Sequence, residues 1–448
     1  MYGAAATMQG LTLFLLLPFA TRLLSPGEYG TVVVALVLQT VLSVVSGAGL
    51  PEVLSRIYFL EPSGPDRARG AVVVAVASGA AAAALADSTG RWWSEPILGL
   101  SYDPPLRLAV WSSAVLVAVL ASQAVLRASS RALCYIAVAA FANPGGHVLG
   151  LTLCATWQAD ATSYLIGYSV AVVAAAVVGF ASIGIARPPI GLMRGDLALS
   201  VPTVPYALGL YVLWSGDRAI IARLESADAA GRYQVAYLIG GFALTLASAL
   251  YNAWVPVVYG SEDDRRWDVL ADTAALLYRL SGFIAGAIAV VAPLVLVAVA
   301  PPEYDPRELA IVSAVVAAAV VPFVAALAYL HVLLWHRRTA TLGWTMPTAA
   351  GINIALNILL VPMVGLVGAA AATVASYFML AVLLWSRTRT LASVPSRTLA
   401  LAQGAAAAVA AGALSVVLPH HGLATASRLI AACGLLALAV RLARHAAK

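Results

Sequence analysis

The chain has 448 residues, of which 62% are hydrophobic and only 10% charged, and its mean hydropathy is +0.92. This composition leaves too little polar surface to cover a water-soluble globule of that size, so the chain belongs in a bilayer. The formal net charge of +6 is spread over short loops with no basic block, which excludes a nucleic-acid-binding surface.

Apolar runs of about 20 residues, the length needed to cross the hydrocarbon core, recur along the whole sequence. They predict an all-α polytopic membrane protein with about 14 transmembrane helices. The predicted spans are centred on Leu15, Leu42, Ala77, Leu116, Val148, Ala174, Leu208, Leu244, Ala287, Ala319, Ile352, Leu380, Ala408 and Leu435.

The distribution of basic residues favours one topology, because cytoplasmic loops carry an excess of Arg and Lys. With the N-terminus inside, every predicted inside loop has at least two basic residues, and most of the 26 Arg and Lys residues fall inside. We therefore predict a multi-pass protein with both termini in the cytoplasm.

A polar segment at residues 21–30 separates the first two apolar runs. Its sequence is Thr-Arg-Leu-Leu-Ser-Pro-Gly-Glu-Tyr-Gly, and its Ser, Pro and Gly are typical of the end of one helix and the start of another. A similar pattern begins at residues 213–218 and continues, after a short apolar run, at residues 226–233. Each copy has an Arg near the end of a first helix and a Gly and Tyr at the start of the next, so the chain is predicted to contain two similar halves.

The repeat predicts the domain organisation. Residues 143–164, in spans five and six, have a rough counterpart in residues 351–377, in spans eleven and twelve. We expect an N-terminal six-helix bundle over residues 1–186 and a C-terminal six-helix bundle over residues 187–390. Residues 391–448 then form two additional helices and a short cytoplasmic tail. Parallel repeats imply a pseudo-two-fold axis along the membrane normal and a cavity between the bundles.

Three segments carry a resemblance to a known family. Residues 22–30 resemble the Arg-Leu-Leu-x-x-x-Glu-Tyr-Gly signature of polysaccharide biosynthesis flippases, members of the multidrug/oligosaccharidyl-lipid/polysaccharide exporter superfamily. Ser215-Gly216-Asp217-Arg218 followed by Gly231-Arg232-Tyr233 is a second match. Residues 357–370 resemble the family's Asn-x-x-Leu-x-Pro-x-x-Gly-x-x-Gly-Ala turn, with one extra residue between Asn357 and Pro362.

The resemblance implies two six-helix bundles in an inverted V plus two C-terminal helices, in a bacterial cell membrane. It also implies the transport of an undecaprenyl-pyrophosphate-linked oligosaccharide, a polysaccharide repeat unit, from the inner to the outer leaflet by alternating access. The partners implied are this lipid-linked substrate, membrane lipids, and a polysaccharide polymerase and glycosyltransferases. No enzyme activity and no cofactor are implied.

A lipid-linked sugar brings a pyrophosphate into an apolar medium, so its carrier needs cations, and Arg grips phosphate oxygens in a bidentate way. The candidate substrate-binding residues are Arg22, Arg56 and Arg218, near the ends of predicted spans, with Asp217 beside Arg218. Their alternative roles are interfacial snorkelling, a local capping pair of Arg22 with Glu28, and a turn ion pair of Asp217 with Arg218.

Three further polar residues are candidates for a proton-sensing or cavity role. His147 follows the Pro-Gly-Gly break in span five, where a titratable group could sense protons. Asn353 and Asn357 lie four residues apart, on one face of span eleven, where they could bind sugar hydroxyls. Packing within and between helices is the alternative for all three.

Several functions remain open from the sequence. A peptidoglycan-precursor flippase would share the fold, whereas a multidrug exporter of the same superfamily would be expected to carry carboxylates within its spans. A polytopic glycosyltransferase or polysaccharide polymerase, or an assembly scaffold, are alternatives of other classes. The sequence predicts no catalytic residues and no metal site, since Cys134, Cys154 and Cys433 lie in apolar runs without a Cys or His partner.

Overall fold

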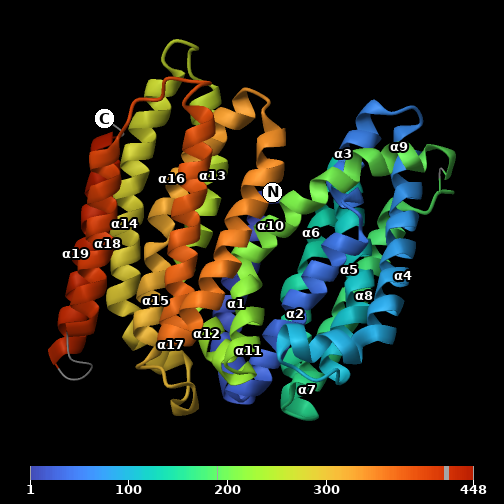
Figure 1. Cartoon of the computed structure of the whole chain (residues 1–448), viewed down its shortest axis with the longest axis horizontal. Helices are drawn as coiled ribbons and strands as arrows, with labels where there is room; N and C mark the ends of the chain where they lie inside the picture. Colours follow the sequence, from blue (N-terminus) through green and yellow to red (C-terminus); the bar gives the residue numbers. More distant parts are fainter. Residues whose placement is uncertain (1, 189, 418–422, 447–448) are drawn as a thin grey trace. The chain divides into compact units, whose positions relative to one another are not determined.

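The computed structural model describes residues 2–188, 190–417 and 423–446, and in these ranges all of the regular structure is helical. The chain divides into two compact units, Met1–Gly231 and Arg232–Lys448. Figure 1 shows the helices of the first unit in blue to green and those of the second in green to red. The predicted all-α class is confirmed.

The first unit contains the following helices: α1 (Tyr2–Leu23), α2 (Pro26–Ser46), α3 (Leu50–Leu60), α4 (Gly64–Leu98), α5 (Pro104–Ala128), α6 (Ala132–Ala140), the π-helix η1 (Phe141–Gly145), α7 (Gly146–Thr156), α8 (Ala161–Ile183), α9 (Ile190–Ser200), the 3₁₀-helix η2 (Val201–Thr203), α10 (Val204–Tyr211), the π-helix η3 (Val212–Gly216) and α11 (Asp217–Leu224). The next helix, α12 (Ala227–Gly240), begins in this unit and ends in the second.

The second unit continues with α13 (Phe242–Tyr259), α14 (Arg266–Val299), the 3₁₀-helix η4 (Pro302–Tyr304), α15 (Leu309–Ala318), α16 (Val320–Trp335), the 3₁₀-helix η5 (Thr339–Thr341), α17 (Leu342–Thr388), α18 (Thr398–Val417) and α19 (Leu423–Ala446). Within this unit, α14 packs along α18 and α19.

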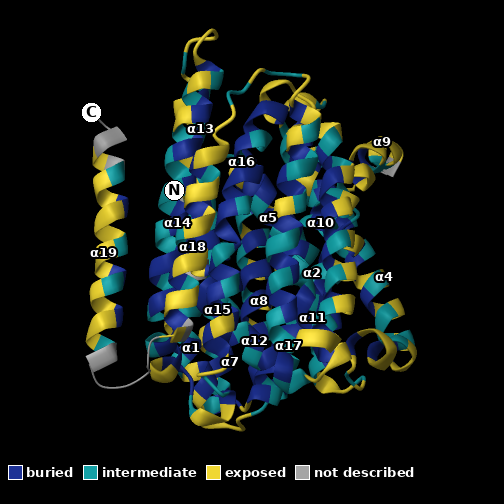
Figure 2. Cartoon of the chain, turned by 60° about the vertical axis from the view of Figure 1, so that its left-hand side comes forward, coloured by how far each residue is buried: buried dark blue, intermediate teal, exposed yellow. Residues whose placement is uncertain are grey.

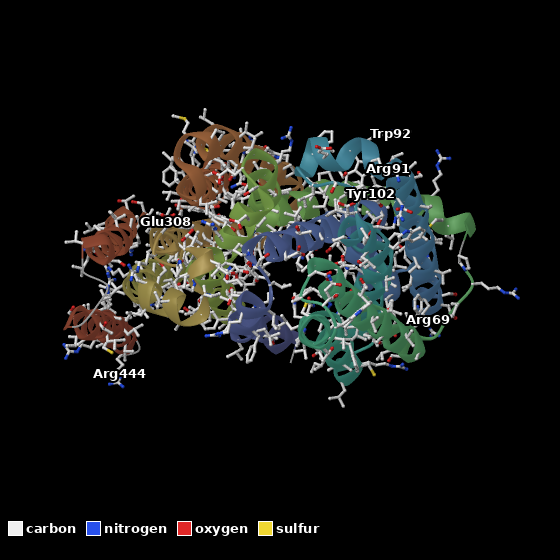
Figure 3. All side chains as sticks on the ribbon, turned by 90° about the horizontal axis from the view of Figure 1, so that it is seen from below. Arg69, Arg91, Trp92, Tyr102, Glu308 and Arg444 are labelled. Carbon is white, nitrogen blue, oxygen red and sulfur yellow. The ribbon has the colours of Figure 1, made fainter. Side chains whose placement is uncertain are left out.

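Across the described residues, 12 helical segments are long and apolar enough to cross a membrane, and Thr12–Leu23 is a shorter apolar helix. The chain is therefore a multi-pass helical membrane protein, while the count of about 14 spans stays a prediction. In α4, charged residues lie towards the two ends, and Figure 3 labels Arg69 near its start and Arg91 near its end. The stretch between them, residues 70–86, is uncharged, as a span requires.

Many apolar side chains point outward. On α19, for example, Leu429, Ile430 and Val440 are exposed, and Figure 2 shows the exposed faces of this helix in yellow. A water-soluble protein rarely exposes apolar patches of this extent, whereas a bilayer solvates them.

The predicted helix boundary at residues 21–30 is confirmed. α1 ends at Leu23 and α2 begins at Pro26, and the Ser25 hydroxyl accepts a hydrogen bond from the Glu28 backbone N–H at 3.3 Å. Pro26 at the first helical position needs no partner for a backbone N–H. The second copy has the same cap, because the Ser226 hydroxyl accepts from the Ala229 backbone N–H at 3.1 Å.

The two glycine residues of these copies touch each other's helix. A Cβ on Gly30 would lie 1.7 Å from the Ala227 carbonyl oxygen, and a Cβ on Gly231 would lie 2.0 Å from the Pro26 carbonyl oxygen. Each glycine therefore packs on the carbonyl four residues before the other glycine. The first turns of α2 and α12 cross backbone to backbone, which only residues without a side chain allow.

The predicted turn between spans eleven and twelve is a break inside α17. Val364 and Gly365 have non-helical angles, and Gly365 has a φ of 61° and a ψ of −144°. The Asn353 side-chain amide donates to the Ser376 hydroxyl at 3.2 Å, so the two halves of α17 lie side by side as a helical hairpin. In a straight helix these two residues would be about 35 Å apart.

The compact units meet in the chain at Gly231, whereas the sequence repeat suggested bundles that divide after Ala186. Helices α10 and α11 pack against α2 and so belong to the first compact unit. The predicted bundles of residues 1–186 and 187–390, with residues 391–448 after them, follow from the sequence repeat and not from the compact units, and they stay a prediction.

In the second unit, Arg428 of α19 is fully buried. Its guanidinium donates to the Val290 carbonyl oxygen at 3.1 Å and to the Ser415 carbonyl oxygen at 2.8 Å, and so ties α19 to α14 and α18. The charge is held inside the helix packing by backbone oxygens.

We expect the replacement Gly30→Ala to destabilise the protein by about 3 kcal/mol, at the upper end of overpacking costs, because the added methyl group meets a backbone oxygen that cannot move aside. The measurement is thermal unfolding of the purified protein in detergent. Gly27→Ala is the matched control, since a Cβ there meets nothing within 4 Å in the same helix. Equal unfolding temperatures for the two variants would contradict the close crossing.

Candidate functional site

Asp217 and Arg218 form a buried ion pair at the start of α11. Their side chains are 2% and 4% exposed, and Arg218 Nη1 lies 2.5 Å from Asp217 Oδ1. The same guanidinium nitrogen donates to the Trp214 carbonyl oxygen, inside the π-helix η3. A π-helix leaves backbone groups out of the regular α-helical pattern, and Arg218 satisfies one of them. The geometry therefore gives this pair a structural role within the first unit.

Arg22 has a different environment. It is exposed at the end of α1, and its guanidinium donates to the Pro18 carbonyl oxygen at 3.0 Å. Glu28 accepts a hydrogen bond from the Ala161 backbone N–H at 2.6 Å and so caps the N-terminus of α8. The Ser25 hydroxyl caps α2, as described above. The positively charged side chain of Arg22 is therefore accessible.

The two copies of the helix boundary assign a different counterpart to Arg22. Ser226 follows Ser25 and Gly231 follows Gly30 by the same number of residues, and at this spacing the counterpart of Arg22 is Arg223. Arg223 is exposed and donates to the Pro96 carbonyl oxygen at 2.8 Å. The sequence pattern had aligned Arg22 with Arg218, whereas the spacing of the serine caps and glycines aligns Arg22 with Arg223, five residues later.

Arg56 lies on α3 and belongs to a network of ion pairs. Its side chain is 48% exposed and pairs with Glu61 at 3.1 Å, and the other oxygen of Glu61 pairs with Arg67 at 3.1 Å. Arg67 also holds the fully buried Asp196 through two nitrogens, at 2.6 and 3.2 Å. The network joins α3, α4 and α9, and sequence analysis did not find Arg67 or Asp196 because they lie far apart in the chain.

His147 packs in the first unit, directly after the π-helix η1. Its Nδ1 lies 2.6 Å from the Tyr164 hydroxyl, and its ring centre lies 5.2 Å from that of Tyr168. Both tyrosines belong to α8. His147 is buried, and its contacts serve the packing of α7 against α8.

Asn353 forms a hydrogen bond across the helical hairpin of α17, and Asn357 bonds to Asn353 within the first half. Both are buried; Asn353 bonds to Ser376, and the Asn357 amide donates to the Asn353 carbonyl oxygen at 2.8 Å. Hydrogen bonds of this kind between membrane helices contribute about 0.6 kcal/mol each. These contacts support the helix-packing role of the pair.

A groove in the second unit has a volume of about 1250 Å³. It is lined by α14, α15, α16, the second half of α17, residues 389–397 and α18. Along α18 its lining runs from Thr398 to Ala413, a distance of about 23 Å at the rise of an α-helix. The hydrocarbon core of a bilayer is about 30 Å thick, so an apolar chain lying in this groove would span most of it.

Small side chains create the groove. Alanine residues line it on every contributing helix, among them Ala274, Ala325, Ala375 and Ala405. Larger residues at these positions would fill the space between the helices, whereas alanine leaves it open. The described lining contains no carboxylate.

One end of the groove is polar. Arg389, Ser393, Ser396, Arg397 and Thr398 lie in or next to the segment between α17 and α18. Arg389 is exposed, and its guanidinium lies 5.5 Å from the centre of the Trp385 ring. Arg397 is 39% exposed and pairs with Asp272 at 2.6 Å. The groove thus combines an apolar track with a mouth of cations and hydroxyl groups, on the side predicted to be cytoplasmic.

The groove is not evident from the sequence, because it depends on the faces of helices from five parts of the chain. The available signal was local: small residues recur at positions 402, 405, 412 and 413 of α18, close to one helical face. A stripe of this kind is also typical of close helix packing, so it did not distinguish a groove from a contact.

Comparisons with known proteins show the fold. No protein-family model and no curated protein sequence matches the chain. Solved structures of transporters do, so the chain has the fold of the multidrug/oligosaccharidyl-lipid/polysaccharide exporter (MOP) superfamily.

Among these structures, the lipid II flippase MurJ in its inward closed conformation is 12% identical and has a TM-score of 0.72, with 97% of each chain covered. An inward-facing multidrug resistance MATE family transporter is 12% identical with a TM-score of 0.68, and covers 86% of this chain and 98% of its own. A MOP superfamily transporter from Pyrococcus furiosus is 10% identical with a TM-score of 0.54, and covers 87% of this chain and 93% of its own.

We expect Arg218→Ala to destabilise the protein by about 3–5 kcal/mol, because it removes the cation that pairs with the buried Asp217 carboxylate at 2.5 Å. The double replacement Asp217→Ala with Arg218→Ala should recover most of this loss, since it removes both charges. The measurement is the yield and unfolding temperature of the purified protein. Arg223→Ala, an exposed cation on the same helix, is the control. A double variant no more stable than Arg218→Ala would contradict the structural role of the pair.

Proposed function

We propose that the protein is a flippase that moves an undecaprenyl-pyrophosphate-linked oligosaccharide from the cytoplasmic to the outer leaflet of a bacterial cell membrane by alternating access. The groove of the second unit is the observation that carries this proposal. An apolar track next to a cationic mouth matches a substrate with a prenyl chain and a pyrophosphate.

The mouth supplies the chemistry that the headgroup needs. Pyrophosphate carries several negative charges, and guanidinium groups bind its oxygens with paired hydrogen bonds. Arg389 and Arg397 lie where the polar end of a substrate would enter, with hydroxyl groups from Ser393, Ser396 and Thr398 beside them. Arg22 is the candidate in the first unit, because it is an exposed cation at the end of α1.

The fold supports a transporter, and its neighbours include both a lipid-linked substrate carrier and multidrug exporters. The groove favours the lipid-linked class, because carriers of cationic drugs need negative charge and the described residues that line the groove include no carboxylate. A peptidoglycan-precursor flippase is the second candidate. The structure of a lipid II flippase covers 97% of this chain.

The proposed transport cycle neither breaks nor forms a covalent bond, so it requires no enzyme activity. Its partners would be the glycosyltransferases that assemble the lipid-linked oligosaccharide and the polymerase that consumes it. Both termini would lie in the cytoplasm, with the mouth of the groove at the inner leaflet.

Blocking the groove should stop transport. We expect Ala405→Trp to reduce translocation of an undecaprenyl-pyrophosphate-linked oligosaccharide at least tenfold, because the indole fills the apolar track. The measurement uses proteoliposomes and an added glycan-cleaving enzyme to count substrate in each leaflet. Ala406→Trp is the matched control, since the neighbouring residue is exposed and is not part of the groove.

The results would decide two questions: whether the groove is the lipid track, and which class of substrate is transported. Loss of transport in Ala405→Trp but not in Ala406→Trp supports the groove as the lipid track. Equal transport in both variants would contradict that role. Transport of lipid II or of a cationic dye, with no transport of the pyrophosphate-linked oligosaccharide, would replace the proposed substrate by one of the alternatives.

A further inference from the structure

His331 of α16 is a buried polar group without a hydrogen bond. Its side chain is 0% exposed, and neither Nδ1 nor Nε2 has a partner among the described residues. A neutral imidazole carries one donor and one acceptor, and burying both without partners costs free energy. Most buried polar groups in proteins are paired, so packing alone does not account for a histidine at this position.

Three aromatic side chains of α13 enclose the imidazole. The ring centres of Tyr251, Trp254 and Tyr259 lie 4.7, 4.8 and 5.6 Å from that of His331. The Tyr259 hydroxyl also donates to the His331 carbonyl oxygen at 3.2 Å. We call these four residues the His331 box. The box is the aromatic contact between α13 and α16.

A small cavity adjoins the box. It has a volume of about 50 Å³, lies between α13, α14 and α16, and is lined by Tyr251 and Trp254 together with Ser281 and mostly aliphatic residues. A water molecule needs about 10–15 Å³ on this measure, so there is room for water beside the box. Its lining is almost entirely apolar, so water would enter only if the packing of α13 loosened.

A row of aromatic rings links the box to the polar end of the unit. Tyr259 lies 5.4 Å from Trp335, and the Arg266 guanidinium lies 3.7 Å from the centre of the Trp335 ring. Arg266 is the first residue of α14 and follows a charged loop that is predicted to be cytoplasmic. The box therefore lies a few side chains from the loop that is predicted to be cytoplasmic.

No described counter-ion faces the imidazole. The titratable and charged side chains of α16 and of the helices packed against it are Tyr251 and Tyr259 on α13; Arg266, Asp268, Asp272, Tyr278 and Arg279 on α14; Tyr329 on α16 itself; and Tyr377 and Arg387 on α17. α15 and α18 carry none within their described bounds. Asp272 is held by Arg397, and the described ring contacts of His331 are all aromatic.

We propose that His331 is a proton-binding site, and that proton uptake there loosens α13 from α16. The closed box offers the neutral ring aromatic contacts but offers a charged ring no carboxylate and no water. A protonated imidazole favours an arrangement in which water reaches the ring, and by linkage that arrangement favours the proton. Such a site would let a proton gradient bias the packing of the second unit. The proposal is independent of the transported substrate.

Cysteine accessibility in the full-length protein tests this site. Cys134, Cys154 and Cys433 are replaced by Ala, and Ala247→Cys places a single thiol in the wall of the cavity on α13. The rate of its reaction with a small methanethiosulfonate reagent is measured from pH 8 to pH 5. Each rate is divided by that of the same unfolded protein at the same pH, which removes the effect of thiol ionisation.

With His331 present, we expect the corrected rate to rise at least tenfold between pH 8 and pH 5. His331→Phe keeps the ring contacts but binds no proton, and its rate should not change with pH. His331→Leu serves if the Phe variant does not fold. His147→Phe is the control for the other buried histidine, and it should keep the rise.

Two outcomes would overturn the proposal. One is a corrected rate that does not change with pH in the protein that retains His331, a result that needs no further variant. The other is the same rise in His331→Phe or His331→Leu as in the parent protein, since the proton would then bind elsewhere.

Discussion

Two glycine residues, Gly30 and Gly231, allow the first turns of α2 and α12 to touch backbone to backbone. The contact is reciprocal, since each glycine packs on the carbonyl four residues before the other, and each helix begins after an equivalent serine cap. The chain passes from the first compact unit to the second at Gly231, so α12 enters the second unit directly from this crossing. Because carbonyl oxygens occupy the space of the missing side chains, the close approach of these two first turns within the first unit depends on the absence of two methyl groups.

Space in the second unit also follows from small side chains. Alanine residues on five helices leave a groove of about 1250 Å³, and its one polar end carries Arg389 and Arg397. The hydrophobic effect draws an apolar chain into such a track, while guanidinium groups hold a phosphate at the mouth. On the side of α16 that meets α13, large aromatic rings close the packing around His331. The second unit therefore contains both an open apolar groove and a buried histidine that is tightly enclosed by aromatic rings.

The local features of the fold were predictable from the sequence. The helix boundary at residues 21–30 and the break at Gly365 follow from Ser, Pro and Gly, whose conformational preferences act within a few residues. The fold class follows from apolar runs in the same way. The candidate residues were harder, because a charge in the sequence does not reveal its partner. Asp217 and Arg218 are neighbours and pair as a local alternative had suggested, whereas Asp196 meets Arg67, which is 129 residues away. The groove and the His331 box depend on helices brought together by the fold.

The proposed movement of a lipid-linked oligosaccharide across the bilayer can be measured as the orientation of that lipid in membrane vesicles from cells with and without the protein, with an externally added glycan-cleaving enzyme as the probe. If the protein is the flippase, the pool facing the cytoplasm grows when the protein is missing, while the glycan itself keeps its length and composition. An unchanged orientation together with an altered glycan would rule out the flippase and would indicate a role in synthesis or polymerisation.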